Sequence, residues 1–173
     1  HSNLTALGQV LLQLPVDVYI GKMCLFGALF RCLDPALSLA AILTNRDPFV
    51  SPVYQRQEAR VIKNSWCSTS FRSDPLCILN AYEEWSKLQR IDPNRANRSA
   101  YKNMLSRTTL FQIQQVKENL FTSLVKANVI QVIKNSKTLM PRYRKRVRET
   151  DPEFNVNAHS TSFLSALIAV SSP

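Results

Sequence analysis

Glycine is scarce in this chain of 173 residues, which has only Gly8, Gly21 and Gly27. Three isolated glycines cannot form the glycine-rich loops that cradle nucleotide phosphates, so we expect no site that binds or hydrolyses ATP. Turn-rich β architectures also need more glycine than this. Leucine, alanine, glutamine, lysine and arginine are plentiful instead, and most of them favour helices. The composition therefore predicts an all-α chain.

Histidine is equally rare, and the sequence shows no cluster of catalytic residues. With only His1 and His159 present, acid–base, nucleophilic and metal chemistry lack their usual partners. The neighbouring carboxylates of Glu83 and Glu84 would point about 100° apart on a helix, so we expect them on a solvated face. We therefore predict that this chain is not itself an enzyme and holds no metal or cofactor.

Cysteine is present four times, but without a C-x-x-C pair or a regular secreted framework. Cys24 and Cys32 lie in an apolar helical run, where we expect buried free thiols. The most apolar span, 23–43, is interrupted by two charged residues and a proline, so we expect no contact with a membrane interior. The sequence predicts a cytoplasmic location, with a nuclear one as the alternative.

Negative charge is missing from one long stretch. The whole net charge of +10 lies beyond residue 50, because acidic and basic residues cancel before it. The segment "KNSKTLMPRYRKRVR", 134–148, has no acidic residue. Its cations, which we call the basic patch, are Lys134, Lys137, Arg142, Arg144, Lys145, Arg146 and Arg148. This patch would attract a polyanion; the alternatives are a solvated loop and a nuclear import sequence.

Apolar residues at helical spacing predict a bundle of about seven helices. The expected helical segments are 7–14, 18–33, 35–44, 54–64, 76–91, 101–105, 109–127 and 161–170. Aspartates before prolines, Asp34 and Asp74, are expected to cap helices, and a capping box at Thr109 is expected to start the longest one. The stretch "DPNRANRS", 92–99, is typical of a loop. The segment 35–44 is apolar nearly all round, which predicts a central helix with Leu39 and Ile42 in the core.

Several motifs together carry a resemblance to a known family. The segment 4–52 contains L-T-x-L-G, L-P, G-K-M, C-L-D-P and D-P-F in that order. The strings "SDPLCILNAYEEW" and "NMLSRTTLFQIQQVKENL" follow, and "FLSALIAVSSP" closes the chain. The ordered combination resembles the helicase-associated region of DEAH/RHA-type RNA helicases, and is most similar to their long cytoplasmic members. Pro75 stands where that family has a histidine.

The resemblance implies a domain order. A ratchet-like helical bundle would occupy 9–130, after the end of a winged-helix segment at 3–8. A basic loop or insertion would follow at 131–160, and a terminal helix, 161–173, would lead to an OB-fold. In such helicases the bundle packs on the RecA-like domains, forms one wall of the single-stranded RNA channel and couples RecA-domain motion to translocation. ATP and Mg would bind elsewhere in the parent protein, an RNA-stimulated ATPase.

Candidate RNA contacts lie at the starts of two helices, where free amides, hydroxyls and a guanidinium group suit phosphate. These residues are Ser73, Asp74, Asn103, Ser106, Arg107 and Thr108. The alternative is that Ser73, Asp74 and Thr108 only cap helices. Arg46 and Asp47 are expected to form a structural turn.

The resemblance also implies partners. We expect single-stranded or structured RNA, the RecA-like, winged-helix and OB-fold domains of the same chain, and a protein activator. A competing hypothesis is a helical protein-interaction module that docks a helicase cofactor or a ribosomal partner, with RNA contact incidental. Salt would discriminate between them, because phosphate binding weakens steeply with ionic strength whereas an apolar docking groove does not.

Overall fold

The computed structural model describes residues 16–67, 73–127, 129–130 and 148–171. In these ranges it contains seven α-helices and two short 3₁₀ helices, which confirms the predicted all-α bundle. The α-helices are α2 (Val18–Leu29), α3 (Leu33–Thr44), α4 (Arg56–Ser65), α5 (Asp74–Ile91), α6 (Pro93–Lys102), α7 (Arg107–Lys126) and α9 (Thr161–Ser171). The 3₁₀ helices are η1 (Val53–Gln55) and η2 (Pro152–Phe154). Among the described helices, none is long and apolar enough to cross a membrane.

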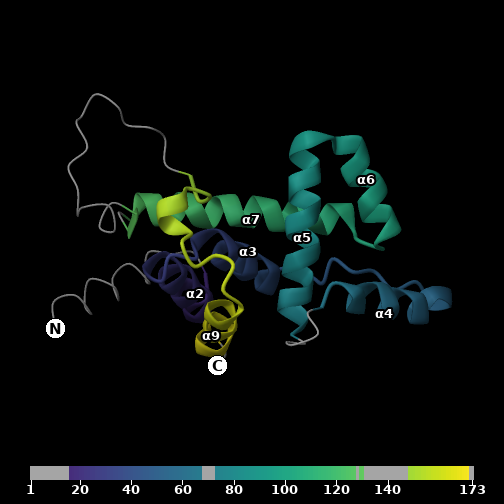
Figure 1. The fold of residues 1–173 in the computed structure, drawn as a ribbon, viewed down its shortest axis with the longest axis horizontal. Coiled ribbons are helices and arrows are strands. Elements are labelled where there is room, and N and C mark those ends of the chain that lie inside the picture. Colours follow the sequence, from purple (N-terminus) through teal and green to yellow (C-terminus); the bar gives the residue numbers. More distant parts are fainter. Residues whose placement is uncertain (1–15, 68–72, 128, 131–147, 172–173) are drawn as a thin grey trace. The chain divides into compact units, whose positions relative to one another are not determined.

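Some predictions concern residues that the structure does not describe. The expected helix at 7–14, the winged-helix segment 3–8 and every cation of the basic patch except Arg148 lie outside the described residues. Elsewhere the helices belong to two compact units. Unit 1 comprises residues 1–40 and 117–173, and unit 2 comprises residues 41–116. Figure 1 shows α2 and α9 of unit 1, and α4, α5 and α6 of unit 2.

The core of unit 1 contains a close approach of α2 to α3. A Cβ atom added to Gly27 on α2 would stand 2.2 Å from the Cβ atom of Ala36 on α3. Glycine at this position therefore lets the two helices approach closely. Cys24 and Cys32 are buried free thiols, as predicted. Burial raises the pKa of Cys24 to about 12 and that of Cys32 to about 11, so both stay protonated at neutral pH.

The segment 148–160 holds the turn that connects α2 to α3. The Asn155 side-chain oxygen accepts a hydrogen bond from the backbone amide of Asp34 at 2.8 Å. Asn157 donates its side-chain amide to the Phe30 carbonyl at 2.8 Å and its backbone amide to the Arg31 carbonyl at 2.9 Å. Arg31 has a φ of 57°, so this turn is sharp. The predicted cap was wrong: α3 begins at Leu33, and the bond to the first-turn amide comes from Asn155, far along the chain.

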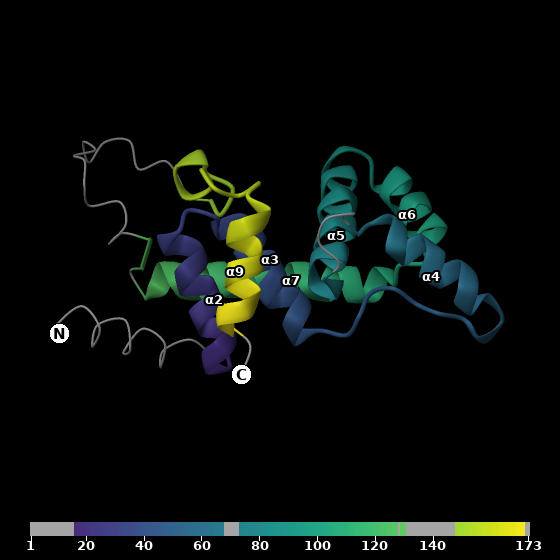
Figure 2. The same ribbon diagram turned by 60° about the horizontal axis from the view of Figure 1, so that its bottom comes forward.

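The Asp34 carboxylate has a different role from the predicted one. It forms an ion pair with Lys117 of α7, whose side chain is only 9% exposed. A buried lysine is costly unless a carboxylate pairs with it, because its charge has lost most of its hydration. The helix α9 also packs alongside α2 (Figure 2), with the ring centroids of Phe30 and Phe163 6.1 Å apart. Unit 1 therefore joins segments from the two ends of the described chain.

Replacement of Asn155 by alanine should weaken this arrangement. The side chain accepts the Asp34 amide and donates to the carbonyls of Glu149 and Asp151 at 2.7 and 2.9 Å. We expect Asn155→Ala to lower the free energy of unfolding by about 1–2 kcal/mol, since buried backbone groups lose their partners. Urea unfolding measures this, with the exposed Asn94→Ala on α6 as control. Equal stability of the two variants would contradict the role of Asn155.

Unit 2 is formed by α4, α5, α6 and the first half of α7. Trp85 of α5 is buried and meets Phe111 of α7 edge to face, with ring centroids 5.0 Å apart. The antiparallel bridge between Phe49 and Leu105 links the segment after α3 to the one before α7. α6 contacts α5 and buries Ala96 and Ala100.

Two predictions about the region of α6 were wrong. Residues 92–99 are not a loop, because the Asp92 carboxylate accepts the backbone amides of Asn94 and Arg95 at 3.0 and 3.2 Å and so caps α6. Pro93 occupies the first helical position, where no N–H is needed. The short helix expected at 101–105 is instead the end of α6 and a turn in which Met104 has a φ of 52°.

Candidate nucleic-acid interface

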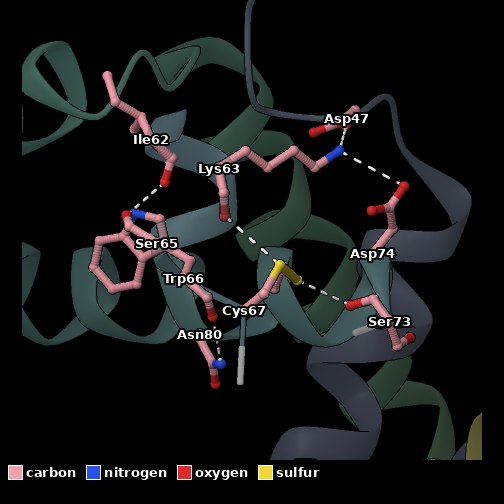
Figure 3. The surroundings of a disulfide bond; sticks show 10 residues. Asp47, Ile62, Lys63, Ser65, Trp66, Cys67, Ser73, Asp74 and Asn80 are labelled. Atoms are coloured by element: carbon pink, nitrogen blue, oxygen red, sulfur yellow. Dashed lines mark hydrogen bonds and ion pairs between the residues drawn. A yellow bond between two sulfur atoms is a disulfide. The ribbon is translucent and has the colours of Figure 1, made fainter. Parts of the chain in front are cut away.

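The predicted contacts Ser73 and Asp74 lie beside a disulfide. Cys67, just after α4, is bonded to Cys77 in the first turn of α5 (Figure 3). Asn80 of α5 donates to the Trp66 carbonyl at 2.9 Å and reinforces the same junction. The sequence did not reveal this pair, because its spacing matches no recognised motif. Disulfides are rare in cytosolic proteins, so the predicted cytoplasmic location does not account for it.

Ser73 and Asp74 differ in their surroundings from a phosphate site. Ser73 precedes α5 but makes no side-chain capping bond, so the capping alternative does not describe it. The Asp74 carboxylate is 3.8 Å from the Lys63 ammonium, which pairs more closely with Asp47 at 2.7 Å (Figure 3). One cation shared by two carboxylates leaves a net negative charge, which disfavours phosphate at this point.

The turn at Asp47 is structural, as predicted. One oxygen of its carboxylate accepts the backbone amide of Phe49 at 2.9 Å, while the other pairs with Lys63. The Lys63 ammonium also lies 5.8 Å from the centroid of the Phe49 ring. Asp47 therefore fixes the entry to α4 rather than presenting a free carboxylate.

Asn103 and Ser106 are occupied by contacts within the fold. The Asn103 side chain accepts the Trp66 indole N–H at 3.2 Å and donates to the Ser99 carbonyl at 2.9 Å. The Ser106 hydroxyl accepts from the backbone amide and the hydroxyl of Thr109, at 3.4 and 3.2 Å. Ser106 therefore caps α7, which begins at Arg107, and the capping box predicted at Thr109 was wrong. Both side chains have structural roles that limit their use for a ligand.

Arg107 and Thr108 are the predicted contacts that remain available. Both are exposed in the first turn of α7. Their side chains make no hydrogen bond or ion pair with any part of the chain that the structure describes. The first amides of a helix have no acceptor within it, and its N-terminus carries partial positive charge. A guanidinium, a hydroxyl and free amides thus meet at one exposed point, which suits a phosphate group.

Comparison with known proteins identifies the family. Residues 17–104, just over half of the chain, match the family described as "Helicase associated domain (HA2), ratchet-like". The chain belongs to this family. The resemblance to the helicase-associated region of DEAH-type RNA helicases is thereby confirmed. The HA2 match includes Ser73, Asp74 and Asn103 and ends before Arg107.

Three relatives with longer chains are similar to this HA2 chain. ATP-dependent RNA helicase DHX29 of Mus musculus is 45% identical over 126 residues, which are 72% of this chain and 9% of that protein. ATP-dependent DNA/RNA helicase DHX36 of Homo sapiens is 34% identical over 168 residues, 97% of this chain and 15% of that protein. Putative ATP-dependent RNA helicase DHX57 of Homo sapiens is 41% identical over 123 residues, 71% of this chain and 9% of that protein. The chain thus spans a small part of each relative.

One charged surface of the HA2 chain was not predicted from the sequence. Because 92–99 was expected to be a loop, Arg95, Arg98 and Lys102 were not recognised as members of one helix face. The cap at Asp92-Pro93, followed by cations spaced three and four residues apart, could have shown it. Arg148 of the basic patch is exposed, and its backbone amide donates to the Asp151 carboxylate at 3.1 Å.

Proposed function

We propose that this chain is the non-catalytic helicase-associated domain of an ATP-dependent RNA helicase. In that protein it would form part of the single-stranded RNA channel and couple the motion of RecA-like domains to RNA translocation. Two of the relatives are named as RNA helicases and a third as a DNA/RNA helicase, which supports RNA as the ligand. This domain would act together with the RecA-like, winged-helix and OB-fold domains of the parent protein.

The first turn of α7 carries this proposal. Arg107 and Thr108 offer an exposed cation and hydroxyl beside unpaired amides, while most of the other predicted contacts are engaged within the fold. Such a group binds phosphate without reading bases, as a translocating enzyme requires. We assign ATP and Mg to no residues of this chain, because its three isolated glycines cannot form a glycine-rich phosphate loop. They would bind elsewhere in the parent.

Substitution of Arg107 in the complete helicase tests the contact. We expect Arg107→Ala to raise the RNA concentration for half-maximal ATPase about fivefold, since loss of one charged phosphate contact costs about 1 kcal/mol. ATPase without RNA should not change. Lys87→Ala, which removes an exposed cation of α5, is the control. Normal RNA stimulation and unwinding by the Arg107→Ala protein would reject the α7 contact.

A second candidate function is docking of a protein partner. The side chains of Val53 and Tyr54 in η1 and of Val61 in α4 are 71%, 99% and 65% exposed. Exposed apolar side chains close together in sequence can mark a protein interface. Rejection of the Arg107 contact would leave this interaction module, docking a helicase activator or a ribosomal partner, as the better hypothesis.

A further inference from the structure

The outer face of α6 carries three cations that no acidic residue of the helix balances. Arg95, Arg98 and Lys102 are spaced by three and four residues, so they lie on one side of the helix. All three are exposed, and the opposite side buries Ala96 and Ala100. The three side chains therefore form one continuous basic surface.

The cations of this face have no described partner within the fold. Their side chains take part in no ion pair or hydrogen bond with the described parts of the chain. The nearest acidic residue in the sequence, Asp92, uses its carboxylate to accept the amides that cap α6. Like charges three and four residues apart destabilise a helix. Repulsion among the three cations weakens α6, and only Lys102, in the last turn near the negative end of the helix dipole, gains a partial offset. The surface is therefore suited to an external anion.

An aromatic ring accompanies the cations. Tyr101 lies three residues after Arg98 and beside Lys102, and its side chain is 89% exposed. A ring this exposed contributes little to the stability of the fold. It can instead stack on a nucleobase while the cations hold the adjacent phosphates. An acidic peptide would use the cations without needing the ring. The combination therefore favours single-stranded nucleic acid over an acidic protein segment.

We propose that the outer face of α6, defined by Arg95, Arg98, Tyr101 and Lys102, binds single-stranded RNA through its phosphates, with Tyr101 stacked on a base. This inference rests on the proposed function and adds a contact made by residues other than Arg107 and Thr108. From Arg95 to Lys102 the helix rises roughly 10 Å, enough for the cations to meet two or more successive phosphates. Binding through phosphates and one stacked ring tolerates any base sequence.

Salt-dependent binding of a fluorescein-labelled oligouridylate tests the proposal. Arg142, Arg144, Lys145 and Arg146 are first changed to glutamine in the 173-residue chain, so that the basic patch does not mask weaker contacts. On this background, Arg95→Gln, Arg98→Gln and Lys102→Gln are combined, because glutamine keeps helix propensity. The matched control combines Arg56→Gln, Arg60→Gln and Lys87→Gln, which removes equal charge from exposed positions of α4 and α5.

The α6 variant should lower the slope of log K against log salt by about 2, since each single-strand phosphate contact contributes about 0.7. Its affinity at low salt should fall about tenfold or more, while the control variant should change the slope by less than about 0.5. If the two variants changed the salt slope and the affinity equally, the α6 cations would act only through their general positive charge. That result would overturn the proposal. Arg98→Gln alone, with an expected slope change of about 0.7, gives the same test with less change to the helix.

The tyrosine separates RNA from acidic protein. Tyr101→Ala should lower oligouridylate affinity about fivefold or more without changing the salt slope, and Tyr101→Phe should keep the affinity. If polyglutamate competes as well as oligouridylate and Tyr101→Ala has no effect, the surface fits acidic protein and the proposal fails. Normal RNA stimulation of an Arg107→Ala helicase would reject the α7 contact without affecting the α6 proposal. An α6 variant that binds oligouridylate like its control would reject the α6 proposal without affecting the α7 contact.

Discussion

Gly27→Ala is expected to lower the free energy of unfolding by about 3 kcal/mol. The added methyl carbon would stand 2.2 Å from the Cβ atom of Ala36, a fully buried residue of α3 with no side chain that could rotate away. The helices α2 and α3 would have to separate. Intrinsic propensity acts in the opposite direction, since alanine is favoured over glycine within a helix by about 1 kcal/mol. The steric term is larger, so the variant should be less stable in urea.

A compensating substitution makes this test specific. Ala36→Gly, added to Gly27→Ala, removes the atom that the new methyl group meets. We expect the double variant to regain most of the loss, apart from about 1 kcal/mol for glycine in α3. A double variant no more stable than Gly27→Ala, or a single variant as stable as the unaltered chain, would show that the close contact is not what limits residue 27.

Leu39→Ala should cost about 2–5 kcal/mol of unfolding free energy. Leu39 is fully buried on α3 and Ile42 is only 4% exposed, so the predicted core positions of both residues are confirmed. Truncation leaves a cavity that close-packed neighbours fill only in part. Leu43→Ala on the same helix is the control, because Leu43 is 42% exposed. Similar melting temperatures for the two variants would contradict the expected core position of Leu39.

The sequence predicted elements whose cores are apolar and local. The helices α3 and α9 have continuous apolar surfaces, and their limits were predicted to within two residues. α6 was missed because it buries only alanines, Ala96 and Ala100, so the spacing of large apolar residues gives no indication of it. Its start depends on the cap at Asp92, which has the same Asp-Pro form as Asp34-Pro35. The Asp-Pro pattern was thus used to predict a cap at Asp34, which does not cap α3. It was not used at Asp92, which does cap α6.

The candidate site was predictable only as a set of chemical groups. The sequence shows that Asn103, Ser106 and Arg107 can all contact phosphate, but not which of them the fold uses for itself. Asn103 is engaged by Trp66, and Ser106 by Thr109. Such pairings depend on tertiary contacts that no local spacing encodes. The bond from Asn155 to the Asp34 amide, between residues 121 positions apart, is of the same kind.

The cap supplied by Asn155 has a consequence for where this domain can be cut. The family match ends at residue 104, yet Lys117, Asn155 and the whole of α9 complete unit 1 after that point. A polypeptide ending at residue 104 would keep the portion that matches the HA2 family. It would lack Lys117, the ion-pair partner of Asp34, and it would lack α9, so the side of α2 that packs against α9 would be exposed to water. The family match is therefore shorter than the folded unit, although the similarity to DHX36 extends over 97% of the chain. Expression of a stable domain should extend through residue 171.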